Sequence, residues 1–184
     1  MENAFSVSPR HMGHIGEATV NEARISEYEN KADAIARAVE GVPDRILNAA
    51  PGDDAWSIHE ILIHLSDSEI VYSERLRRAI GDDDATVAPF DESAWGDRLH
   101  YGGRDARAAL TLVRALRAVN ADLLRRLDVA GWERTVTHSE AGPMTVARLV
   151  QTLVEHADYH IAQIDRIKAA HGLPDRAVDA HGAG

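Results

Sequence analysis

The chain has 184 residues, of which 45% are hydrophobic and 27% charged, and this composition excludes a disordered or collagen-like protein. Its 20 basic and 30 acidic residues give a formal net charge of −10, the wrong sign for a nucleic-acid partner. The absence of cysteine excludes disulfides and thiolate ligands, so a bound metal would need carboxylates or some of the 10 histidines.

The first part of the chain predicts a loosely held segment followed by a helix. Residues 1–20 mix glycine, serine, proline and histidine without periodicity, which is typical of a loosely ordered arm or a helix lead-in. Apolar side chains then recur at helical spacing from Ile25 to Val39, before Gly41 and Pro43 interrupt the pattern. No signal-peptide pattern and no apolar run of about 18 residues occur, so we expect a cytoplasmic protein with no membrane partner.

The second predicted helix has a clear start and is followed by a long link. Ser57 and Glu60 have the spacing of a capping box, so a helix should begin near Ser57 and run to Gly81. Residues 81–103 are rich in acidic side chains and lack periodicity. Links of this length inside a compact domain are usually functional or mobile.

Two further helices complete the predicted domain. Apolar positions from Leu110 to Leu127 mark the third helix, and Thr145 caps a fourth that ends near His171. No convincing alternation indicates strands. We therefore expect an all-α four-helix bundle with long irregular links over residues 21–172, followed by a C-terminal tail over 173–184.

Three histidines are candidate metal ligands. His156 and His160 are four residues apart, so their imidazoles project about 40° apart on one helix face, a spacing that lets two imidazoles share one ion. His64 lies on the inward side of the second helix, whereas His59 lies about 140° further round. Histidines on apolar faces are also common as core residues. The absence of zinc-protease and Glu-x-x-His motifs favours a mononuclear site if a metal is bound.

Four short segments resemble the DinB-like superfamily in sequence and in order, most closely its YfiT-type members. They are WSIHEILIHLSDSE at 56–69, PFDESAW at 89–95, HSEAG at 138–142 and HADYHIAQI at 156–164. The resemblance spans about residues 25 to 170. It implies a four-helix bundle in which His64, His156 and His160 bind one ion, usually zinc or nickel. Tyr159 stands where many members have a further histidine.

The resemblance also implies an activity. Members have been assigned as thiol S-transferases that use bacillithiol or mycothiol, and as a mycothiol-dependent maleylpyruvate isomerase, and YfiT-type members were once described as metal-dependent hydrolases. The matching segment and the length of the link predict that residues 81–103 pack across one end of the bundle beside the metal. Phe90 and Trp95 would then form a wall of the pocket.

Polar residues near the histidines have a functional and a structural interpretation. Asp67 could orient an imidazole or pair with an arginine. Gln163 could reach the cavity or remain a surface amide. His138 could act as an acid or base near the metal, although loop histidines are usually solvated. The arginines of the third helix are interpreted as its solvent-exposed side.

The tryptophans likewise have two interpretations. Trp56 and Trp95 are candidates for substrate binding, and Trp95 could form a lid over the metal. Tryptophans near helix ends and in links more often pack over a bundle than bind substrate.

Three functions are compatible with these residues. The first hypothesis is a thiol S-transferase, in which the divalent ion activates a low-molecular-weight thiol against a small-molecule electrophile. The second is a metal-dependent hydrolase that activates water at the same position. The third is a non-catalytic, metal-stabilised protein that binds ligands in a stress response. A homodimer is possible in each case.

Overall fold

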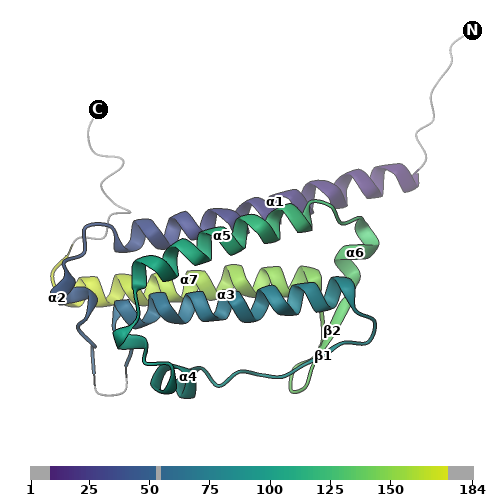
Figure 1. The fold of residues 1–184 in the computed structure, drawn as a ribbon. Helices are drawn as coiled ribbons and strands as arrows, with labels where there is room; N and C mark the ends of the chain where they lie inside the picture. The colour runs from purple at the N-terminus through teal and green to yellow at the C-terminus, as the bar shows by residue number, and fades with distance from the viewer. Residues whose placement is uncertain (1–8, 53–54, 174–184) are drawn as a thin grey trace, which may run out of the picture.

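Four long helices form most of the computed structural model, which describes residues 9–52 and 55–173 (Figure 1). They are α1 (Pro9–Val39), α3 (Ile58–Gly81), α5 (Ala106–Leu124) and α7 (Val146–Ala170). Neighbours pack in the ring order α1, α5, α3, α7, so the consecutive helices α1 and α3 lie diagonally across the bundle. Among the described helices, none is long and apolar enough to cross a membrane.

Helix directions explain why the bundle needs a long link. Figure 1 shows α1 and α7 running one way along the bundle and α3 and α5 running the other way. Because α3 and α5 are parallel, residues 82–105 must return along the length of the bundle. This return carries β1 (Thr86–Val87), α4 (Glu92–Arg98) and the short 3₁₀ helix η1 (Tyr101–Gly103). Both α4 and η1 contact α3. The prediction that the link crosses one end of the bundle is therefore wrong.

Side-chain caps fix where the helices begin. The hydroxyl of Ser57 accepts a hydrogen bond from the backbone N–H of Glu60, whose carboxylate accepts from the Ser57 N–H in return. Thr145 caps α7 by accepting from the Arg148 N–H at 3.1 Å. Both predicted caps are confirmed. Asp91 and Asp105 cap α4 and α5, so some acids of the link have a local structural role.

The predicted four-helix bundle is confirmed, and a small sheet that the sequence did not indicate is added to it. β1 pairs in parallel with β2 (Thr135–His138), which pairs antiparallel with β3 (Gly142–Thr145), giving a three-stranded sheet. The fold is mostly helical, a four-helix bundle with this sheet at one end (Figure 1). The strands have two to four residues, too few to show alternation in the sequence. Short helices α2 (Asp44–Leu47) and α6 (Val129–Glu133) also lie in connections.

The first long helix begins earlier than the periodicity indicates. Helix α1 starts at Pro9, so residues 9–20 follow the helix lead-in alternative and not the loosely ordered arm. The apolar periodicity begins at Ile25, which is also the first core residue of α1 among the described side chains, so the pattern did not report the earlier turns. Residues 1–8 and 174–184, which include nearly all of the expected tail, lie outside the described residues.

The core has a polar layer between two apolar clusters. One cluster, near the sheet, joins Tyr28, Leu76, Leu124 and Leu149. The other, near α2, joins Ile35, Ile61, Val113 and Ile164. Between them lie buried polar side chains, which are His64, Glu69, Arg117, Asn120 and His160. Because buried polar groups are costly unless they are satisfied, this layer is where a functional site is expected.

Candidate metal centre

The three histidines predicted as ligands meet where α3 packs on α7. The Nε2 atoms of His64 and His156 are 3.0 Å apart, and so are those of His156 and His160. Each histidine offers a ring nitrogen within 4.8 Å of the other two. Consecutive turns of α7 supply His156 and His160, and α3 supplies His64, so helix packing alone builds this histidine cluster.

Burial keeps the three imidazoles neutral. His64 is 0% exposed, and desolvation together with the neighbouring histidines lowers its pKa to about 3. Desolvation and nearby positive groups lower the pKa of His156 to about 3 as well. The pKa of His160 is also lowered by desolvation. Since only the neutral imidazole can bind a metal, the cluster presents ligand-competent side chains well below neutral pH.

Hydrogen bonding inside the histidine cluster leaves lone pairs for a metal. Gln163 Oε1 lies 2.9 Å from His160 Nδ1 and accepts its N–H, which puts the lone pair of His160 on Nε2. His156 Nε2 can donate to at most one of its two neighbours. The 3.0 Å spacing of adjacent Nε2 atoms is close to the roughly 3.3 Å between ligands of a tetrahedral ion with bonds of about 2.0 Å. The residues present therefore fit a divalent ion.

One side of the histidine cluster opens into a cavity of about 380 Å³. Its lining includes His156, His160, Trp56, Tyr159 and Glu92. The Glu92 carboxylate lies 3.7 Å from His64 Nε2 and is 49% exposed. Desolvation raises the pKa of Glu92 above its usual value. A carboxylate beside the nitrogens, at the mouth of a cavity, is placed to exchange protons with a molecule bound there.

A second cavity of about 170 Å³ shares Glu92 and His156 with the first. Phe90 lines it, at 6.4 Å between ring centroids from His64. Arg75 and His138 lie on its far wall, where the guanidinium Nη2 is 3.4 Å from His138 Nε2. The two cavities therefore meet at Glu92 and His156.

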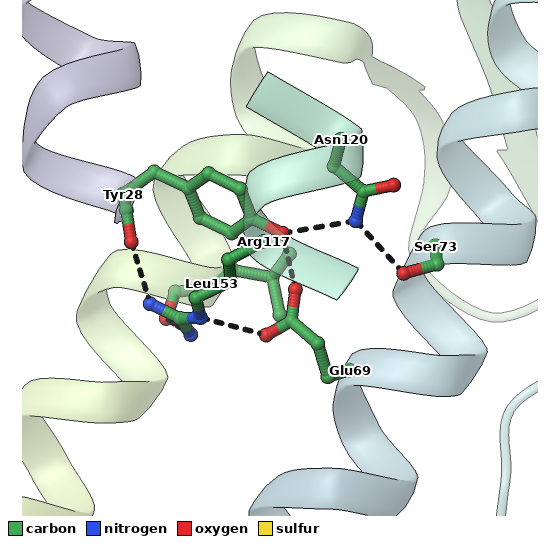
Figure 2. Close-up of polar contacts among 6 residues, drawn as sticks. All are labelled: Tyr28, Glu69, Ser73, Arg117, Asn120 and Leu153. Atoms are coloured by element: carbon green, nitrogen blue, oxygen red, sulfur yellow. Dashed lines mark hydrogen bonds and ion pairs between the residues drawn. The ribbon is translucent and has the colours of Figure 1, made fainter. Parts of the chain in front are cut away.

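A separate polar network, the Glu69–Arg117 network, lies deeper in the bundle (Figure 2). Figure 2 shows Glu69 accepting hydrogen bonds from the Tyr28 hydroxyl and from Arg117 Nε, the second at 2.9 Å. Arg117 also donates to the Tyr28 backbone carbonyl at 2.8 Å. Asn120 donates to the Tyr28 and Ser73 hydroxyls at 3.0 and 2.8 Å. Its charged and amide groups satisfy one another, so this network has no evident need for a ligand.

One residue predicted near the metal, Asp67, has another partner. Both Asp67 oxygens accept from Arg104, at 2.7 and 3.1 Å, so Asp67 follows the structural alternative. The buried Nδ1 of His64 has no hydrogen-bond partner among the described residues. The amide that orients an imidazole is Gln163, which also lines the larger cavity.

Of the aromatic residues predicted near the metal, Trp56 and Phe90 line the cavities, whereas Trp95 packs against other aromatic side chains. Trp56 lines the larger cavity and packs on His64 with ring centroids 4.6 Å apart. Phe90 lines the smaller cavity. Trp95 does not line either cavity; it packs on Phe90, at 5.0 Å between centroids, and on the small apolar cluster around Tyr101. The prediction that Phe90 and Trp95 form a wall of the pocket therefore holds for Phe90 and not for Trp95.

Sequence reasoning missed Glu92 and Arg75. Glu92 lies in the quoted segment 89–95, but its carboxylate reaches His64 only because α4 packs on α3. Arg75 follows His64 by eleven residues, or about three turns, and so occupies the same face of α3. That spacing was a usable signal, because an arginine on an inward face is costly unless it has a partner.

Comparison with known proteins gives the family context. The family model of the DinB superfamily matches residues 27–164. A protein of Oceanobacillus iheyensis, named as a putative metal-dependent hydrolase, is 27% identical over 152 residues, which cover 83% of this chain and 87% of the relative. YfiT of Bacillus subtilis, named in the same way, is 25% identical over 149 residues, covering 80% and 84%.

The fold is also found among solved structures. The structure of YfiT from Bacillus subtilis, described as a probable metal-dependent hydrolase with an unusual four-helix bundle topology, matches with a TM-score of 0.78. The match covers 95% of each chain at 22% identity. This chain and YfiT therefore share the same overall fold, and a shared fold does not by itself imply a shared activity.

Proposed function

The chain belongs to the DinB superfamily, and on that premise we propose that it is a metal-dependent hydrolase of small acyl substrates. One observation carries the proposal: three histidines meet beside a cavity that His156, His160 and Glu92 line, and the Glu92 carboxylate lies 3.7 Å from the third, His64. The names of the relatives support a hydrolase over a thiol S-transferase, which was the first hypothesis from the sequence. His64, His156 and His160 would hold the ion. A divalent ion held by three imidazoles supplies Lewis acidity and makes water a better nucleophile near neutral pH.

The protein's own groups account for the rest of the chemistry. The raised pKa of Glu92 makes its carboxylate a stronger base than an ordinary glutamate, and Oε2 takes a proton from the attacking water. The water oxygen bonds to the acyl carbon, the bond to the leaving group breaks, and Glu92 returns the proton to that group. Trp56 supplies an apolar wall for the substrate, while Gln163 holds the His160 ring in the required tautomer.

The test is a comparison of ester and amide hydrolysis by protein loaded with Zn²⁺ or Ni²⁺ in thiol-free buffer. We expect metal-dependent turnover that Glu92→Gln lowers about 100-fold or more, because a positioned base contributes that much. Asp97→Asn, an exposed acid on the same helix, is the matched control and should retain activity.

The competing functions have distinct outcomes in the same assay. Turnover that requires an added thiol and saturates with it would replace the hydrolase with the S-transferase. If no thiol or ester is turned over, and metal removal lowers only the melting temperature, the protein is a metal-stabilised binding protein.

A further inference from the structure

Arg75 is an exception among the buried charged side chains. Its side chain is 4% exposed, yet no carboxylate of the described residues lies within ion-pairing distance of its guanidinium. The other deeply buried charges are paired: Glu69 with Arg117 at 2.9 Å and Asp67 with Arg104 at 2.7 Å. A buried charge without a counter-charge is costly, so an arginine in this position needs an explanation.

The contacts that Arg75 does make are neutral. Its Nη2 donates to the Ala88 carbonyl at 2.7 Å, and its guanidinium carbon lies 4.8 Å from the centroid of the Tyr72 ring. These contacts hold the guanidinium against the wall of the smaller cavity without neutralising it. Several of its five N–H donors remain available for an acceptor in that cavity.

The neighbouring histidine adds a second donor. His138 Nδ1 lies 3.3 and 3.2 Å from the backbone N–H groups of Glu140 and Ala141, and accepts from them. The hydrogen of the neutral ring is then on Nε2, which faces Arg75 Nη2 at 3.4 Å. With that hydrogen on Nε2, the contact between the two nitrogens is not a hydrogen bond. Arg75 and His138 both line the cavity as donors for an acceptor oxygen bound there.

We propose that the smaller cavity is a carboxylate subsite, in which Arg75 and His138 bind a carboxylate carried by the substrate. This inference rests on the proposed function, because the cavity adjoins the histidine cluster through His156 and Glu92. A substrate anchored by its carboxylate at Arg75 would place its reacting bond over the cluster. The hydroxyls of Ser68 and Tyr72 also line the cavity and can complete the contacts.

Size and charge favour a carboxylate over a phosphate. The volume of about 170 Å³ is below the roughly 300–1,000 Å³ of pockets that enclose a whole ligand, so it suits one end of a small molecule. Arg75 supplies a single positive charge, which matches a monoanion and suits the two oxygens of a carboxylate. The acidic side chain of Glu92 on the same cavity disfavours a second negative charge.

The test uses benzoate and benzamide, which have the same shape and differ in charge. Each is titrated into full-length protein, with and without Zn²⁺, while the amide and side-chain NMR signals of Arg75 and His138 are followed. We expect saturable benzoate binding that shifts both residues, also without metal, and at least tenfold weaker benzamide binding. Inorganic phosphate should bind more weakly than benzoate.

Variants of Arg75 give an independent check. Arg75→Met should weaken benzoate binding at least tenfold and leave benzamide unchanged, while Arg75→Lys, which keeps the charge, should fall between. Arg114→Met removes an exposed arginine on α5 and is the control, with benzoate binding unchanged. If Arg75→Met is poorly folded, the benzoate-to-benzamide ratio of the unmodified protein still decides the question.

Three results would overturn the subsite: equal binding of benzoate and benzamide, benzoate binding that Arg75→Met does not change, or signal shifts confined to the histidine cluster. Phosphate binding tighter than benzoate binding would contradict the carboxylate assignment. Because the titration without Zn²⁺ measures no turnover, a protein that binds benzoate at Arg75 but hydrolyses nothing would retain the subsite and lose the proposed function.

Discussion

Two buried polar clusters lie within the same bundle, and only in one of them do the polar groups pair with one another. In the Glu69–Arg117 network, opposite charges pair and the amide of Asn120 joins two hydroxyls (Figure 2). In the histidine cluster, His156 Nε2 lies 3.0 Å from the Nε2 atoms of His64 and His160 and can donate to only one of them, so the three rings cannot all satisfy one another. The comparison teaches that burial alone does not mark a site. A candidate site is indicated by buried polar groups whose donors and lone pairs cannot all be paired within the protein.

The two clusters should respond differently to substitution and to metal. The Glu69–Arg117 network should contribute to stability with or without a metal, because its partners are all side chains and backbone of the same chain. The histidine cluster should lower the free energy of unfolding of the metal-free protein and raise it once an ion is bound.

The largest expected effect is the loss of Arg117. Arg117→Met should lower the free energy of unfolding by about 3–5 kcal/mol, because Glu69 is left as an unpaired buried charge. Urea denaturation measures this loss. The double variant Glu69→Met/Arg117→Met should recover much of it, since neither charge remains. If Arg117→Met were as stable as the unmodified protein, the ion pair between Glu69 and Arg117 would contribute nothing to stability.

Acid should destabilise the metal-free protein through the histidine cluster. The pKa values of His64 and His156 are lowered to about 3 in the folded state, against about 6.5 in the unfolded chain. The unfolded state therefore binds more protons between these values, and stability falls as the pH drops below about 6.5. The free energy of unfolding at pH 7.5 and at pH 5.5 should differ by about 2.7 kcal/mol for these two histidines together.

The variant His156→Ala is the control for this acid effect. It removes one of the two strongly shifted groups and relieves repulsion on the others, so the metal-free variant should lose less stability between the two pH values. An equal loss in both proteins would place the acid sensitivity outside the histidine cluster.

The smallest expected effect on stability comes from Gln163. Gln163→Leu removes the acceptor for His160 Nδ1–H, which should weaken metal binding about 10- to 100-fold while the free energy of unfolding of the metal-free protein changes by less than about 1 kcal/mol. Competition with a coloured chelator measures the affinity. Gln151→Leu is the matched control, because Gln151 is a half-buried glutamine of the same helix whose amide donates to Glu155 and not to a histidine. Unchanged affinity in Gln163→Leu would show that the amide does not orient the ring.

The sequence predicted the parts of this molecule that depend on local periodicity. Helices α3 and α7, their caps at Ser57 and Thr145, and the convergence of His64 with His156 all follow from 3.6-residue spacing and an inward face. The sheet, Glu92 and the Arg75 cavity depend on how the return over residues 82–105 packs on α3, which spacing does not report.

The same limit explains the errors at Asp67 and Trp95. Asp67 is three residues from His64, a spacing that permits contact, but the approach of η1 and Arg104 gives its carboxylate a stronger partner. Trp95 is close to the site in sequence, but the turn of α4 directs it onto Phe90 and the Tyr101 cluster. In both cases tertiary packing selected between two locally equivalent arrangements.

The most direct test of the central claim is thermal and urea unfolding of the full-length protein with and without Zn²⁺ or Ni²⁺, compared with His156→Ala. His156 Nε2 lies 3.0 Å from both other ligand nitrogens, so its loss should disable the whole histidine cluster. The account predicts that metal at about 100 times its dissociation constant stabilises the unmodified protein by about 2.7 kcal/mol and leaves His156→Ala unchanged. No stabilisation of the unmodified protein, or an equal stabilisation of the variant, would contradict the claim that these three histidines bind a metal ion.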